Sequence, residues 1–323
     1  MDWSALEQSA RLFAGAGEQR TGTEVAALRK RVVELVDDAR ELVAAEAEMP
    51  TDPASEVLLV DRRAWAGGNV RTLRRLIQGL DVPGSDAKFV AWEGGALLGL
   101  LARMVLAQFD PFRNQLLVVH PNLGPFAHGD GLRFVVLHEV THLAQFRAAP
   151  WIPDRIVELA QSVLNADTPS WTREMAGQMR RRLPELLTWA RRALEGRAEG
   201  MPLIDMMPAP QRESVLQLHS LVTVLEGHAT HVTDRIAKRV LDDYEGINRR
   251  LEQRRQRPPL MRLVEAASGI EMKRQQYVLG RDFCRAVWEA GGAGALAPAW
   301  RGPEAVPSQE ELRSPELWLA RVA

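Results

Sequence analysis

The chain has 323 residues, of which 46% are apolar, and its formal net charge is −1. This length and apolar content allow a sizeable core in one domain or two, and the near-zero charge excludes a global attraction to nucleic acid. The single cysteine, Cys284, excludes an internal disulfide and fits a reducing cytosol.

The N-terminal segment is predicted to form two helices, over residues 3–15 and 24–47. Thr21 and Glu24 have the spacing of a capping box at the start of the second helix. Prolines at positions 50 and 53 then break the chain. We therefore expect residues 1–54 to be N-terminal helices that pack on a core domain of residues 55–323, or the whole chain to be a single domain.

The core domain is predicted to begin with a short strand at residues 57–60, followed by a helix that Asp61 caps and that runs to about residue 80. Apolar residues from Gly94 to Phe109 predict a further helix. Residues 115–119 are a second strand candidate, directly before the most informative stretch of the chain. At the edge of a sheet this strand could pair with an extended peptide, whereas inside a sheet it could not, and the sequence leaves both arrangements open.

The stretch from Phe134 to Phe146 contains the motif His138-Glu139-x-x-His142. Residues four positions apart lie on one face of a helix, so both imidazoles can reach one metal ion. Glu139 lies beside them and can accept a proton from a metal-bound water. Apolar residues surround the motif, which predicts a buried helix, with Asp130 as its N-cap. Because buried polar groups need partners, a metal site is favoured over satisfied core residues.

A third ligand is needed, since catalytic zinc usually takes three protein ligands and a water. It cannot come from the next turns, where Gln145 and Ala148 stand. Residues 211–240 show a helical apolar period, and Glu226 lies at the border of its apolar stripe. Glu226 is therefore the expected third ligand, and Gly227 beside it would allow another backbone to approach closely.

Three histidines of the same predicted helix are placed less favourably. His219 lies two turns before Glu226 on the same side, His228 lies on the opposite flank, and His231 is expected to point mostly away from the core. His219, His120 and Tyr277 are candidates for stabilising an oxyanion, although each is more readily explained as structural.

The combination of HExxH with the distant segment Leu225-Glu226-Gly227-His228-Ala229 resembles the gluzincin branch of zincin-like metallopeptidases. Further stretches, including Val119-His120-Pro121-Asn122-Leu123, are similar to a bacterial zincin-like family whose members are often labelled as associated with biosynthesis of the deazaflavin coenzyme. The resemblance implies a zincin-like metallopeptidase core, zinc bound by His138, His142 and Glu226, and Glu139 as general base. Two features depart from thermolysin-like enzymes: the longer interval between His142 and Glu226, and Thr230 where an Asp often supports a zinc histidine.

The remaining segments are mostly predicted helices, over residues 154–165, 171–195, 273–290 and 310–322, with a loop at 201–210 and a flexible glycine segment at 291–294. Arginine runs at residues 180–182, 191–192 and 249–257 contain little aromatic interleaving and are interspersed with Glu, so we interpret them as solvated helix faces. Cys284 lies between apolar neighbours and is expected to be a structural residue.

These features predict an α+β, predominantly helical protein with a small sheet next to the HExxH helix, acting as a zinc-dependent metallopeptidase on a peptide or small amide. Two alternatives are a binding protein that holds zinc without catalysis and a di-iron carboxylate protein. The second alternative requires another Glu-x-x-His pair, which the Glu226 helix lacks. No apolar run approaches the roughly 20 residues of a membrane span, and the start of the chain lacks the pattern of a signal peptide. We therefore expect a cytoplasmic protein without membrane or nucleic-acid partners.

Overall fold

The computed structural model describes residues 2–76, 87–164, 207–255 and 270–323. The chain divides into two compact units, residues 1–153 with 232–244, and residues 154–231 with 245–323. The helix expected at 171–195 lies outside the described residues, as do residues 201–206 of the expected loop, whereas Ala209 and Pro210 already belong to a helix. The division of the sequence into segments 1–54 and 55–323 stays a prediction.

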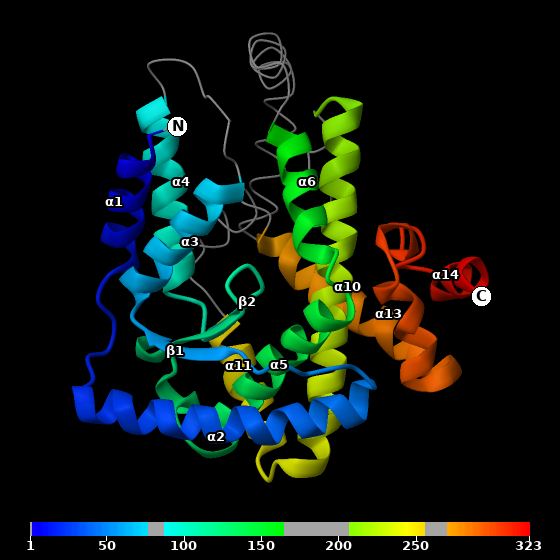
Figure 1. Ribbon diagram of the computed structural model, residues 1–323, viewed down its shortest axis with the longest axis horizontal. Coiled ribbons are helices and arrows are strands. Elements are labelled where there is room, and N and C mark those ends of the chain that lie inside the picture. Colours follow the sequence, from blue (N-terminus) through cyan, green and yellow to red (C-terminus); the bar gives the residue numbers. More distant parts are fainter. Residues whose placement is uncertain (1, 77–86, 165–206, 256–269) are drawn as a thin grey trace. The chain divides into compact units, whose positions relative to one another are not determined.

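The first unit combines helices with one small sheet (Figure 1). Its elements are α1 (Trp3–Ala14), α2 (Gly22–Ala47), β1 (Glu56–Val60), α3 (Arg62–Leu76), α4 (Ala87–Ala102), β2 (Ala107–Asp110), β3 (Gln115–Val119), the 3-10 helices η1 (His120–Asn122) and η2 (Gly124–Phe126), and α5 (Gly129–Ala148). The end of α10 (Ala209–Val240) also belongs to this unit.

The N-terminal capping predictions are confirmed. Glu24 N–H donates to the hydroxyl of Thr21 at 3.3 Å, while the Glu24 carboxylate accepts from Thr21 N–H at 2.7 Å. Asp61 accepts from Ala64 N–H at 2.6 Å and so caps α3. These side chains satisfy helix N–H groups that have no partner within the helix.

The sheet has the strand order β1-β3-β2, with β1 parallel and β2 antiparallel to β3. Strand β3 is thus central, and pairing on both sides leaves it no free edge for an extended peptide. Of the two arrangements that the sequence leaves open for residues 115–119, the structure contains the strand inside the sheet, and β2 takes an edge position in the sheet that the described residues form. A parallel and an antiparallel partner both fit β3 because its residues are buried and apolar on both faces.

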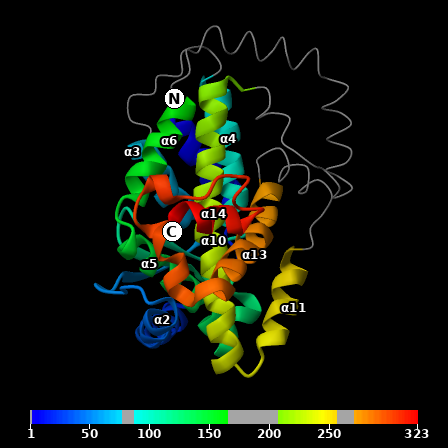
Figure 2. The same cartoon turned by 90° about the vertical axis from the view of Figure 1, so that its right-hand side faces the viewer.

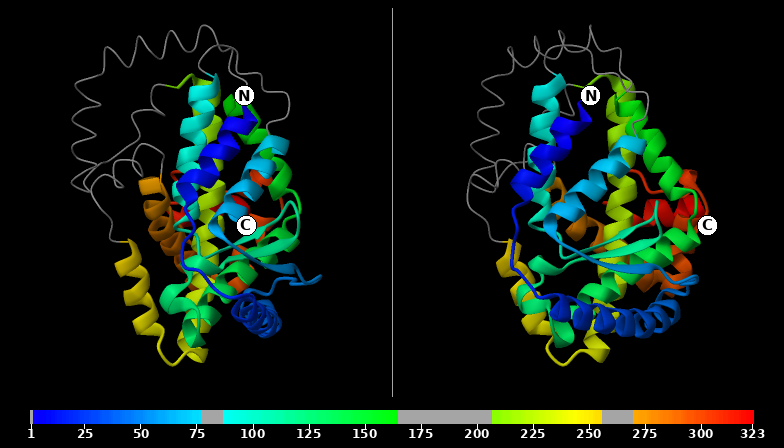
Figure 3. Two further views of the ribbon diagram at one scale, coloured as in Figure 1. Left: turned by 90° about the vertical axis from the view of Figure 1, so that its left-hand side faces the viewer. Right: turned by 60° about the vertical axis from the view of Figure 1, so that its left-hand side comes forward.

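Helices cover the two faces of this sheet (Figures 1 and 3). Leu117 and Val119 of β3 point into a core formed with α1, α3 and α4. Strand residues alternate between faces, so Leu116 and its partner Phe109 point to the other face. There the ring of Phe109 meets Phe146 of α5, with ring centroids 5.7 Å apart. The sheet therefore lies directly against α5, as the sequence predicts.

The helix expected from Gly94 to Phe109 is wrong in its bounds, because α4 ends at Ala102 and residues 107–110 form β2. The buried amide of Asn122 donates to the carbonyl oxygens of Ala102 at 2.8 Å and Val105 at 2.6 Å. These bonds satisfy carbonyl groups at the helix end, and the chain then pairs along β3. Tertiary pairing thus overrides the apolar pattern of the segment.

The second unit is helical in its described residues (Figure 2). Its elements are α6 (Ile152–Leu164), the larger part of α10, α11 (Tyr244–Arg255), α13 (Ile270–Leu296), the 3-10 helices η3 (Ala297–Trp300) and η4 (Pro303–Ala305), and α14 (Pro315–Val322). Helix α13 packs on α14 and bends at Gly291 and Gly292, whose backbone is not helical. The last helix begins at Pro315, later than the expected position 310, since proline suits the first turn of a helix.

The fold class is confirmed: the described chain is predominantly helical and contains a small sheet next to the HExxH helix. Among the described helices, none combines the length and the apolar character required to cross a bilayer.

Candidate metal site

The HExxH motif lies on α5, as predicted, and this helix is buried on nearly every side. The expected N-cap is wrong, because His128 precedes the helix without a side-chain cap and Asp130 lies in the first turn. The carboxylate of Asp130 instead accepts from the backbone N–H groups of Asp242 and Asp243, at 2.8 and 2.9 Å. A negative charge in the first turn is still favourable for the helix dipole.

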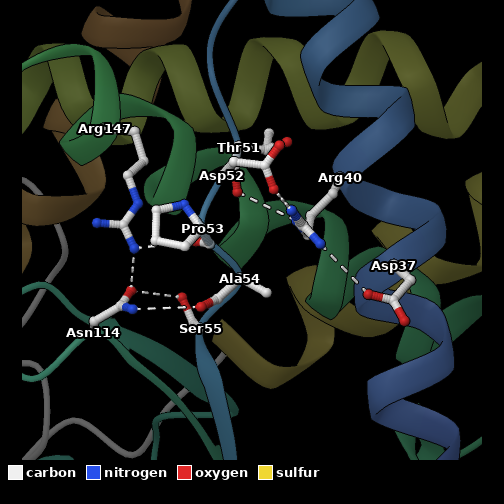
Figure 4. Close-up of polar contacts among 9 residues, drawn as sticks. All are labelled: Asp37, Arg40, Thr51, Asp52, Pro53, Ala54, Ser55, Asn114 and Arg147. Atoms are coloured by element: carbon white, nitrogen blue, oxygen red, sulfur yellow. Dashed lines mark hydrogen bonds and ion pairs between the residues drawn. The ribbon is translucent and has the colours of Figure 1, made fainter.

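The other end of α5 is held by a polar network (Figure 4). Arg147 donates to Oδ1 of Asn114 at 2.5 Å and to the carbonyl of Pro53 at 3.1 Å. Ser55 donates to the same Asn114 oxygen at 3.0 Å. Directly before Pro53, the carbonyl oxygen of Thr51 and the carboxylate of Asp52 accept hydrogen bonds from Arg40 of α2. The network ties the end of the motif helix to the β2–β3 turn and to the segment before β1.

The two motif histidines lie next to each other, with ring centroids 4.9 Å apart and planes nearly perpendicular. Both are half-buried, whereas their neighbours Leu137 and Leu143 are buried. The i, i+4 spacing therefore places two imidazoles together on a partly open part of α5. This is the arrangement that a shared metal ion requires.

Gln145 fixes the orientation of His142. Its Oε1 lies 2.8 Å from Nδ1 of His142, and an amide oxygen can only accept, so Nδ1 carries the proton. The lone pair of His142 is then on Nε2, the nitrogen left for a metal. From the sequence, Gln145 was predicted only not to be a metal ligand. The i, i+3 spacing from His142 was the signal for its role as a hydrogen-bond partner.

Glu139 lies on the buried side of α5, with 8% of its surface exposed. Its Oε2 accepts from the backbone N–H of Phe109 in β2 at 2.7 Å, in a contact that is itself buried. The candidate general base is therefore hydrogen-bonded to the strand that lies beside the motif helix.

Glu226 lies on α10, half-buried between buried neighbours. The expected close approach at Gly227 is confirmed: a Cβ placed there would lie 2.1 Å from the carbonyl carbon of Gly280 in α13. A Cβ on Gly280 would in turn meet the carbonyl oxygen of Thr223 at 2.1 Å. The two helices thus cross at a pair of glycines directly beside Glu226, which fixes this turn of α10.

The histidines of α10 are more buried than expected. His228 meets the ring of Trp300 and His231 meets that of Trp288, with centroids 4.9 and 5.1 Å apart. His231 has 7% exposure, so the expectation that it points mostly away from the core is wrong. The helical wheel assumed one solvated face, whereas indole rings from α13 and η3 cover two sides of this turn.

The structure describes two of the three candidates for oxyanion stabilisation, His219 and His120. His219 accepts at Nδ1 from the amide of Gln309 at 2.8 Å, and burial, followed by the charge of Arg313, lowers the pKa of His219 to about 4. Burial also lowers the pKa of His120, with Arg20 as the next cause. The side chain of Tyr277 lies outside the described residues.

His138, His142 and Glu226 each offer a ligand atom, and these atoms lie within 4.8 Å of one another, so the group could hold a metal ion. Two imidazole nitrogens and one carboxylate oxygen are a known donor set for catalytic zinc. No other group of this kind occurs among the residues that the structure describes. The donor set therefore fits a single zinc ion better than a pair of iron ions, which needs additional carboxylates.

Comparisons with known proteins show the family of the chain and a similar fold. A family model described as zincin-like metallopeptidase matches residues 1–319. The fold is similar to the crystal structure of a protein from Chloroflexus aurantiacus that is described as a candidate hydrolase with a novel fold. The TM-score is 0.71 at 24% sequence identity, over 99% of this chain and 98% of the other. No curated protein matches the sequence.

Proposed function

The chain belongs to the zincin-like metallopeptidase family, and we propose that it is a zinc-dependent hydrolase that cuts a peptide or small amide bond. His138, His142 and Glu226 are the proposed zinc ligands and Glu139 is the proposed general base. The observation that carries the proposal is the group of two imidazoles and one carboxylate, with ligand atoms within 4.8 Å of one another. The description of the Chloroflexus protein as a candidate hydrolase supports the same reaction class.

Zinc in such a site supplies a water whose pKa is lowered toward about 7 and a positive charge that polarises a carbonyl group. Glu139 accepts the proton of the attacking water as the C–O bond forms. Glu139 then transfers this proton to the amine nitrogen as the C–N bond breaks. Gln145 keeps the proton of His142 on Nδ1 and so leaves Nε2 for the metal.

Two observations favour catalysis over a binding protein that only holds zinc. A structural zinc site needs a fourth protein ligand and closed coordination, whereas the group that the described residues form offers three donors. A structural site also has no use for the Glu139 carboxylate, which is buried and held beside the histidines. The natural environment proposed for this activity is the cytoplasm, because the one cysteine suits reducing conditions.

The experiment that tests the proposal is a peptide-library screen with mass-spectrometric detection of products. Zinc-loaded wild type is compared with chelator-treated protein and with His142→Ala, which loses one proposed ligand. We expect cleavage by the zinc-loaded wild type and its loss in both controls, with recovery of the chelated sample on addition of zinc. Bound zinc without cleavage of any peptide or amide would instead favour the binding protein.

A further inference from the structure

Strand β2 has backbone N–H groups that point away from its partner. The carbonyl of Leu106 accepts from Val119 N–H at 2.9 Å, which places this pair in hydrogen-bonding register. In an antiparallel ladder such pairs alternate with pairs that exchange no hydrogen bonds. Gln108 therefore bonds to β3, whereas Ala107 and Phe109 direct their N–H groups to the outer edge of the strand.

The N–H of Phe109 is used by the motif helix. It donates to Oε2 of Glu139 at 2.7 Å, and both residues are buried, at 6% and 8% exposure. The ring of Phe109 packs against Phe146 of the same helix, with centroids 5.7 Å apart. Strand β2 is thus attached to α5 twice, once through its backbone and once through a side chain.

A buried hydrogen bond to one carboxylate oxygen restricts rotation of the whole carboxylate. A free carboxylate exchanges its two equivalent oxygens, because the terminal torsion of Glu is broad and twofold. With Oε2 bonded to an N–H that belongs to a strand of the sheet, the two oxygens of Glu139 become distinct.

We propose that the backbone N–H of Phe109 positions the general base: it holds Oε2 of Glu139 and leaves Oε1 as the oxygen that takes the proton. The inference rests on the proposed function for the role of Glu139 as base, whereas the hydrogen bond is independent of it. The positioning group belongs to the backbone, so replacement of side chains one by one does not remove it. The edge strand next to α5 thereby contributes to catalysis without contributing a side chain.

The first test replaces single amides by esters, through incorporation of hydroxy acids. Phenyllactate at position 109 keeps the ring and removes only the N–H, and lactate at position 107 is the matched control on the same strand edge. We expect the ester at Phe109 to lower kcat at least about tenfold, because small displacements of a catalytic group are costly. KM and zinc content should stay within about twofold, as for loss of an interaction that acts only in the transition state. The ester at Ala107 should leave kcat unchanged. Equal kcat values for the two esters would overturn the inference.

The second test needs no activity. The chain has eight Phe residues, so selective ¹⁵N labelling gives few amide signals, and Phe109→Leu identifies the one at position 109. In Glu139→Ala we expect hydrogen exchange of this amide to accelerate at least about tenfold, whereas Glu139→Gln keeps an acceptor and preserves protection. Unchanged protection in Glu139→Ala would refute the positioning role even in an active enzyme. If protection is lost as expected but wild type cuts nothing, the proposed function fails and the positioning of Glu139 by Phe109 stands.

Discussion

Gln145 and His142 are joined by a hydrogen bond of 2.8 Å between Oε1 and Nδ1, one turn apart on α5. Thermolysin-like enzymes often support a zinc histidine with an Asp from another helix, and the sequence has Thr230 where that residue is expected. Here the support comes from the motif helix itself. The fully buried Gln145 therefore accepts a hydrogen bond from a proposed zinc ligand, in addition to its place in the core.

Replacement of Gln145 should weaken zinc binding. Gln145→Met keeps most of the volume and removes the acceptor, so we expect zinc affinity to fall about 10- to 100-fold, the usual effect of losing such a partner. Gln145→Glu retains an acceptor at the same position and should restore most of the affinity. Competition with a chromophoric chelator measures both values. Wild-type affinity in Gln145→Met would show that the hydrogen bond does not influence the metal.

Replacement of Gly227 should disturb the fold next to Glu226. A Cβ at this position would lie 2.1 Å from Gly280, so Gly227→Ala forces two helix backbones apart. We expect a loss of about 1–3 kcal/mol or more, typical of overpacking. The matched control is Gly294→Ala on α13, where a Cβ would meet nothing within 4 Å. Thermal unfolding followed by circular dichroism compares the two, and equal midpoints would contradict the close approach.

Acid should destabilise the fold through His219. Burial, and then Arg313, lower the pKa of its side chain to about 4 in the folded state, against an ordinary value of 6.5. Between these values the unfolded chain binds a proton that the folded chain does not, so stability falls as pH decreases from about 6.5 toward 4. With allowance for the partial exposure of His219, we expect the free energy of unfolding to fall by about 2 kcal/mol over this pH range.

The variant His219→Gln cannot take up this proton and serves as the control. The difference in urea-unfolding free energy between wild type and variant should shrink as pH falls from 7 to 4.5. A difference that stays constant over this range would mean that His219 is freely protonated in the folded protein.

The thiol of Cys284 should be unreactive in the native protein. The residue is fully buried next to Phe283 and Val287, and burial raises the pKa of its thiol. Because the thiolate is the reactive form, a disulfide reagent should label the cysteine only after unfolding. Rapid labelling of native protein, or loss of activity in Cys284→Ala with bound zinc intact, would contradict the structural role.

The sequence predicted those features that depend on local chemistry. The capping box at Thr21, the HExxH helix and the close approach at Gly227 follow from residue type and spacing alone, and the structure contains all three. The proximity of the two motif histidines could equally be predicted, because the i, i+4 relationship is a property of any helix.

The incorrect predictions concern contacts between segments distant in sequence. Nothing within residues 94–109 shows that the end of this stretch pairs with β3, nor that β1 and β2 flank β3 on both sides. His231 was placed by a wheel that cannot include the Trp288 ring from α13. The hydrogen bond from Phe109 N–H to Glu139 could not be predicted for the same reason, since a backbone N–H carries no signal in the sequence.

The most direct test of the central claim is the substitution Glu139→Gln, with zinc content and cleavage measured on the same sample. Glutamine keeps the size of the side chain and an oxygen for the N–H of Phe109 but cannot accept the proton. We expect one zinc per chain, as in wild type, and cleavage reduced by about a hundredfold or more. Loss of zinc in Glu139→Gln would show that this carboxylate is a ligand, and cleavage at the wild-type rate would show that it is not the base.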